Sequence, residues 1–182
     1  MKDWERAVIV KLVVQVKVIP DAGQASALER TLPAINEAAN RVSAVGFEHF
    51  GLKASIRELR KLCYGELRAG GFGAQAAQHI IKRVADACSA LRANIRAGNL
   101  GPEGSKRRRK AESKAVTFRT DAAHTYDDRC LSWNYDAQTV SIWTLDGRVK
   151  NVRFACSQPR HDLGRGQPSG PQARPVPALA GP

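Results

Sequence analysis

Long apolar runs, close cysteine pairs and acidic residues are all scarce in this sequence of 182 residues. The longest apolar stretch, residues 7–19, is interrupted by Lys11, Gln15 and Lys17, whereas a helix that spans a membrane needs about 20 consecutive apolar residues. The stretch is also a poor signal peptide, because its valines alternate with polar residues and no small-residue cleavage site follows them. The sequence therefore predicts a cytoplasmic protein without a membrane partner.

Cysteine is sparse and widely spaced. The four cysteines are Cys63, Cys88, Cys130 and Cys156, and no two of them form a C-x-x-C pair. A zinc ribbon or a redox motif is therefore not expected. Cys63 and Cys88 fall on the apolar stripes of predicted helices, where cysteine behaves as a small hydrophobic residue. We expect reduced, partly buried thiols, and we predict no metal site and no cofactor.

Acidic residues are outnumbered, with 17 Asp and Glu against 29 Lys and Arg and a formal net charge of +12. Such an excess favours a polyanionic partner, which could be DNA, RNA, an acidic protein or an anionic membrane surface. The excess of charge does not choose among these partners. It indicates a binding protein for a polyanion rather than a particular ligand.

The hydrophobic pattern changes its period along the chain. Apolar residues recur every second position from Val8 to Val18, as in a half-buried strand, and residues 21–98 then show the spacing of three amphipathic helices. Capping boxes at Asp21 and Ser55 predict the starts of the first two helices. Pro33 lies inside the first helix and predicts a kink or a break.

The second half of the chain is expected to hold a linker, strands and a tail. Residues 99–114 combine glycines with a basic run and show no apolar periodicity, which predicts a flexible basic linker. Period-two patterns in residues 115–156, including Val116 with Phe118, predict several antiparallel strands, and Asp146 with Gly147 predicts a hairpin turn. Residues 157–182 contain six of the nine prolines, and we predict this tail to be disordered.

Three segments resemble, in order, the N-terminal half of the TnpB (OrfB) family of transposon-encoded proteins, which are relatives of type V CRISPR effectors. Residues 14–40 are similar to the family's opening strand and helix. The other two segments are residues 64–87, which read YGELRAGGFGAQAAQHIIKRVADA, and residues 140–152, which read VSIWTLDGRVKNV. Matches in the same order over most of a chain reinforce one another.

This resemblance implies an α+β fold in which residues 1–20 and 115–156 form a small antiparallel β-barrel, the wedge domain. Residues 21–98 would then be an inserted three-helix recognition segment. Full-length relatives are RNA-guided DNA endonucleases whose RuvC-like domain follows the wedge, and its three separated carboxylates are not found here. Asp162, with Leu163 and Gly164, only superficially matches the start of that domain. The resemblance thus implies a guide-RNA or DNA binding fragment without catalytic residues. The alternative is one half of a split endonuclease that is active only with a separately encoded nuclease part.

The candidate nucleic-acid-binding residues are basic. They are Lys106, Arg107, Arg108, Arg109, Lys110, Arg148 and Lys150. Point charges of this kind contact phosphates and give salt-sensitive affinity without reading bases. Alternation places Arg148 and Lys150 on the same face of a hairpin.

Two other groups of residues, one aromatic and one polar, could also have a functional role. The aromatic residues Trp133, Tyr135 and Trp143 could stack on bases, but core positions are expected for them. His124 with Asp121, Asp127 and Asp128 forms a polar cluster in a predicted loop. No partner set is identifiable for that cluster, so a catalytic or metal-binding role is not predicted.

Overall fold

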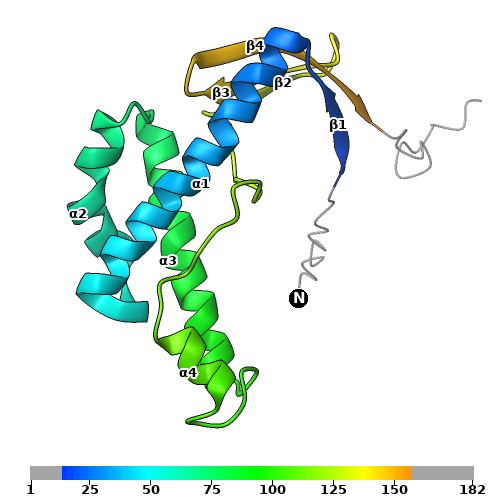
Figure 1. The fold of residues 1–182 in the computed structure, drawn as a ribbon. Helices are drawn as coiled ribbons and strands as arrows, with labels where there is room; N and C mark the ends of the chain where they lie inside the picture. Colours follow the sequence, from blue (N-terminus) through cyan, green and yellow to red (C-terminus); the bar gives the residue numbers. More distant parts are fainter. Residues whose placement is uncertain (1–13, 157–182) are drawn as a thin grey trace, which may run out of the picture. The chain divides into compact units, whose positions relative to one another are not determined.

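The computed structural model describes residues 14–156, which contain four helices and a four-stranded sheet (Figure 1). The α+β class is therefore confirmed. The strands lie in the order β1-β4-β3-β2, so β1 and β2 are the edges of an open sheet and not members of a closed barrel. Residues 17–155 form one compact unit, and the description below concerns that unit. The predicted tail and the first part of the predicted opening strand lie outside the described residues.

Three helices follow the first strand, as the hydrophobic spacing predicts. The elements are β1 (Val16–Ile19), α1 (Ala22–Phe50), the short 3-10 helix η1 (Gly51–Lys53), α2 (Ile56–Ala69) and α3 (Ala74–Arg96). Both capping boxes are formed, with the backbone N–H of Gln24 donating to Asp21 at 2.8 Å and that of Glu58 to Ser55 at 3.3 Å. Pro33 lies inside α1, which is unbroken over its 29 residues. Of the kink or break predicted at Pro33, the break is therefore wrong.

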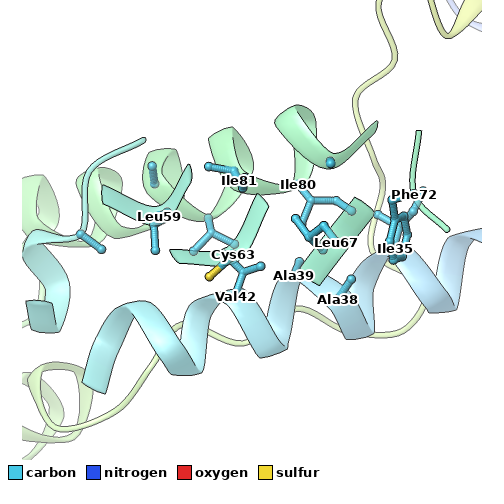
Figure 2. Close-up of a cluster of buried hydrophobic side chains, with 14 of the residues drawn as sticks. Ile35, Ala38, Ala39, Val42, Leu59, Cys63, Leu67, Phe72, Ile80 and Ile81 are labelled. Atoms are coloured by element: carbon cyan, nitrogen blue, oxygen red, sulfur yellow. The ribbon is translucent and has the colours of Figure 1, made fainter. Parts of the chain in front are cut away.

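The hydrophobic core lies between α1, α2 and α3 (Figure 2). Ile35, Leu59 and Ile80 are fully buried there, and burying a side chain of this size stabilises the fold by about 1.5–3 kcal/mol. Cys63 and Cys88 are free and buried in the same cluster, which confirms their predicted positions on the apolar stripes of helices. Burial raises the pKa of both thiols.

The predicted hairpin joins β3 (Thr139–Thr144) to β4 (Gly147–Cys156), and β2 (Leu131–Asn134) pairs with β3 on the other side. Thr144 pairs with Gly147, so Leu145 and Asp146 are the two loop residues. Gly147 has φ +105°, a conformation that favours glycine. The predicted hairpin is therefore confirmed, and its two-residue loop lies one position earlier than the Asp146–Gly147 pair.

Residues 115–122, which we call the strap, belong to no strand and include a turn at Thr120 and Asp121, so the strand predicted at Val116 and Phe118 is wrong. Two asparagines one turn apart on α1 take the place of a partner strand. Asn40 accepts from the Phe118 N–H at 2.7 Å and donates to the Phe118 carbonyl at 3.0 Å. Asn36 donates to the carbonyls of Thr120 and Ala122 at 2.8 and 2.9 Å. Side chains of α1 thereby bond four backbone groups of the strap.

The predicted flexible linker contains a fourth helix, α4 (Lys106–Glu112). Ser105 caps it by accepting from the Arg108 N–H at 3.3 Å, and Arg108 bonds Glu112 one turn later at 2.9 Å. A local cap and an i,i+4 ion pair form this helix without an apolar stripe. Within residues 14–156, no helix is long and apolar enough to cross a membrane.

Candidate nucleic-acid interface

Helix α4 presents most of the basic run to solvent. Lys106, Arg107, Arg109 and Lys110 are exposed, while Arg108 is half-buried. Arg108 therefore turns inward toward the body of the helical segment. Helix α4 therefore carries four positive charges that face solvent and one that points inward.

Arg108 is one wall of an open groove of about 620 Å³ between η1, the end of α3 and α4. Lys53 comes from η1, and Arg92 and Arg96 come from the last turns of α3. Its apolar lining residues are Phe50, Leu52 and Ile95. Among the described residues that line this basic groove, Glu112 alone carries a carboxylate.

The charges of the basic groove are only partly compensated from within. The hydrogen bond to Glu112 raises the pKa of Arg108 and keeps that guanidinium firmly charged. The Nε atom of Arg92 is buried and has no hydrogen-bond partner in the described part of the chain. The groove therefore retains more cationic donors than its own carboxylate can pair.

Arg148 and Lys150 lie elsewhere, on β4. Arg148 pairs in register with Trp143 and donates to the Ser132 hydroxyl at 3.0 Å and to the Arg129 carbonyl. Lys150 is exposed, and its carbonyl accepts from the Gln24 amide at 3.1 Å. The guanidinium of Arg148 thus holds strands together, whereas the Lys150 ammonium is free to face solvent.

The two groups of predicted residues do not form one surface. The groove uses Arg92 and Arg96, whereas the sheet side meets α3 at Gly73 and Gln75, near Trp143 and Asp127. From residue 75 to residue 92 is 17 residues, or about 25 Å of helix at 1.5 Å per residue. The structure therefore separates the α4 residues from Arg148 and Lys150.

The aromatic residues divide between core and surface. Trp143 packs against the helical core, as predicted. Trp133 and Tyr135 are 38% and 74% exposed, so the prediction of core positions is wrong for them. Their rings stack with centroids 6.3 Å apart, and Trp133 also meets Phe154 edge-on. The edge strand β2 and the turn that follows it therefore carry an exposed aromatic pair.

The polar cluster predicted around His124 is completed by residues that sequence spacing did not reveal. Asp127 lies 3.4 Å from His79 Nε2 on α3, and Gln75 Nε2 donates to Asp127 Oδ2 at 2.6 Å. The His124 ring centroid is 6.1 Å from that of His79. Asp121 and Asp128 are exposed and stay outside this cluster. The sequence signal that could have indicated the missed residues was the i,i+4 spacing of Gln75 and His79 on α3.

Burial dominates the electrostatics of this cluster. It lowers the pKa of His124 to about 4, with Arg83 and His79 adding to the effect, and it raises the pKa of the Cys130 thiol to about 11, with Asp127 adding to that. Burial alone would raise the pKa of Asp127. Hydrogen bonds from the Cys130 and Arg129 backbone, together with His79, hold it below its usual value.

No protein-family model, curated protein or solved structure matches this chain.

Proposed function

We propose that this protein binds nucleic acid through the basic groove and the exposed face of α4. The observation that carries the proposal is the convergence of Lys53, Arg92, Arg96 and Arg108 from three elements around one groove with one carboxylate. The four exposed cations of α4 extend this positive surface. The net charge of +12 supplies a long-range attraction for the same kind of ligand.

The shape of the groove suits a phosphate backbone better than a compact anion. It is open, and its cations come from η1, α3 and α4. Lys and Arg in such an arrangement neutralise phosphates and release counterions, which gives affinity that falls with salt. Apolar groove residues such as Phe50 and Leu52 offer contact surface for sugars and bases.

Structured RNA is the ligand that this proposal favours. The resemblance of residues 14–40, 64–87 and 140–152 to the TnpB family implies that the helices are a recognition segment and that the fragment binds guide RNA or DNA. Double-stranded RNA is recognised mainly through its shape and backbone, which requires placed cations and no base-reading helix. Duplex DNA is the second ligand to be tested.

The experiment is a fluorescence-anisotropy titration of a hairpin RNA and of a duplex DNA over a range of salt concentrations. Wild-type protein should bind with a steep negative dependence of log affinity on log salt. The triple variant Lys106→Ala, Arg107→Ala, Arg109→Ala should lower that slope by about 3, or about 1 for each lost phosphate contact.

The matched control removes the same amount of charge from α2. Arg57, Arg60 and Lys61 are exposed there, and the triple variant to alanine also lowers the net charge by three. It should retain the wild-type slope to within about 1. Absence of salt-dependent binding by the wild type, or equal losses in the two triple variants, would contradict the proposal.

A further inference from the structure

Three side chains that commonly bind transition metals converge near the start of α3. His79 comes from α3, and Asp127 and Cys130 come from the turn that precedes β2. Their ligand atoms all lie within 4.8 Å of one another. Imidazole, carboxylate and thiolate are the three ligand types found at protein zinc sites. The turn supplies two of them through Asp-x-x-Cys spacing.

The separation of the first two ligands already fits a shared ion. His79 Nε2 and Asp127 Oδ2 are 3.4 Å apart. Bonds of about 2.0–2.2 Å to a tetrahedral zinc ion place two such ligand atoms about 3.3–3.6 Å apart. The same separation is longer than a normal N–H···O hydrogen bond. The pair would accept the ion with little movement, and Cys130 would have to close by about 1 Å.

Asp127 is held in position for this role. Its Oδ1 atom accepts from the backbone N–H groups of Arg129 at 3.2 Å and Cys130 at 3.1 Å. These bonds fix the carboxylate and leave Oδ2 directed at His79. Hydrogen-bonded carboxylates of this kind are typical of metal ligands, since the second oxygen sets the orientation of the first.

A hydrogen-bond donor now stands where the two ligand lone pairs converge. Gln75 Nε2 lies 2.6 Å from Asp127 Oδ2 and 3.1 Å from His79 Nε2. A carboxylate oxygen at that distance requires a donor, so the amide nitrogen faces both acceptors. With the proton on Nδ1, His79 accepts this bond at Nε2, and a neutral imidazole with a free Nε2 lone pair is the form that binds a metal.

Hydrogen bonding within the cluster does not satisfy the histidine. The Nδ1 atom of His79 is buried and has no partner among the described residues. Gln75 and His79 also line an open pocket of about 220 Å³ between α2 and α3, which gives an ion a path from solvent. The half-buried imidazole is therefore accessible from this pocket, although Asp127 and Cys130 do not line it.

We propose that His79, Asp127 and Cys130 bind one Zn²⁺ ion, with water at the fourth position. A thiolate and an imidazole together favour zinc over magnesium or calcium, which prefer oxygen ligands. The ion fastens the turn before β2 to the first turns of α3. This site is independent of the basic groove, so binding of zinc and binding of nucleic acid succeed or fail separately.

The test uses the full chain, purified without a histidine tag and stripped with a chelator. Cobalt(II) is then added as a spectroscopic probe. One equivalent should give the visible bands of a tetrahedral site and a thiolate-to-cobalt charge-transfer band. Added zinc should bleach both signals and raise the melting temperature of the protein.

Three single variants locate the ligands. Cys130→Ser should abolish the charge-transfer band, and His79→Gln and Asp127→Asn should each weaken cobalt binding by at least about tenfold. Cys63→Ala, in the helical core, and Cys156→Ser are the matched cysteine controls and should retain the wild-type spectrum. Circular dichroism of each metal-free variant verifies that it is folded.

Two results would overturn the site. One is a wild-type chain that takes up no cobalt or shows no charge-transfer band. The other is a charge-transfer band that survives Cys130→Ser but is lost in either cysteine control, because the thiolate would then come from elsewhere. If one variant fails to fold, the remaining two still decide the assignment.

Discussion

The two ends of helix α3 carry different chemistry. Its first turns place Gln75 and His79 against Asp127, in a half-buried cluster of mixed donors and acceptors. Its last turns place Arg92 and Arg96 in an open groove where positive charge dominates. One helix therefore presents a small, directional site and a broad, cationic surface about 25 Å apart.

The two ends of α3 can therefore recognise different kinds of ligand. Distributed cations attract a polyanion at long range and do not need a fixed geometry, because phosphates repeat along the ligand. Imidazole, carboxylate and thiol groups act only at bonding distance and need fixed positions. The groove is thus suited to an extended ligand and the cluster to a single ion.

The strap (residues 115–122) is the piece of chain that connects the two sites, since it leads from α4 to the turn that contains Asp127. It is fastened to α1 by Asn36 and Asn40. Asn36 is fully buried and also accepts from Arg83, whose guanidinium lies 4.4 Å from the Phe118 ring centroid. Loosening the strap should disturb both ends at once.

The largest effect is expected from Asn36→Ala. This variant removes the donor for three carbonyls and the acceptor for Arg83, and leaving such groups without partners costs about 2–4 kcal/mol of unfolding free energy. Urea denaturation measures the loss, and hydrogen exchange should show faster exchange in the strap.

Asn94→Ala is the control, because that side chain is exposed and bonds only Asn99 among the described residues. Its effect should stay below about 0.5 kcal/mol. A loss of less than about 1 kcal/mol in Asn36→Ala would show that the strap is not held as described.

An effect of intermediate size is expected when the pH is lowered, and it arises in the cluster around His124 and not in the groove. The pKa of His124 is about 4 in the folded protein against 6.5 in the unfolded chain, because burial disfavours the charged ring. The stabilisation from neutral His124 is therefore complete above pH 6.5 and is lost as the pH falls toward 4. We expect chelator-treated protein to lose about 1–2 kcal/mol between about pH 7 and pH 5 through this group, allowing for its partial exposure.

The variant His124→Gln should flatten this part of the pH profile, whereas His49→Gln, at an exposed ring on the last turn of α1, should leave the wild-type profile. Denaturant melts at several pH values measure both. An unchanged profile in His124→Gln would assign the acid sensitivity to other groups.

The smallest predicted effect is a change in RNA affinity when the groove loses its carboxylate. Glu112→Gln removes its carboxylate and frees Arg108. Affinity for RNA should rise by about twofold to threefold, since one exposed charge acts weakly through water. The same anisotropy titration measures it, with Glu66→Gln on α2 as the control. A weaker affinity would show that the ion pair positions Arg108 for binding.

Sequence reasoning succeeded where the signal is local. The capping boxes at Asp21 and Ser55 and the hairpin at Gly147 each depend on residues a few positions apart. The basic run was likewise evident from its contiguous charges. These features are readable because the interacting groups are neighbours in the chain.

Sequence reasoning failed where the partner is remote. The alternation at Val116 and Phe118 was real, but the strap pairs with Asn40, 78 residues away, and not with a strand. His79 and Asp127 are 48 residues apart, so neither indicated the other. Helix α4 was missed because it has no apolar stripe and depends on the Ser105 cap and the Arg108–Glu112 pair.

Lysine footprinting with and without a hairpin RNA tests directly whether the groove and α4 form the nucleic-acid interface, because lysines are present both in and away from the groove. The groove and α4 contain Lys53, Lys106 and Lys110, and three of the exposed lysines that lie elsewhere are Lys61, Lys82 and Lys150. The first three should be protected from acetylation by bound RNA, while the other three should react as in the free protein. Protection of Lys61, Lys82 or Lys150 with Lys106 and Lys110 still reactive would contradict the assignment of the groove as the nucleic-acid interface.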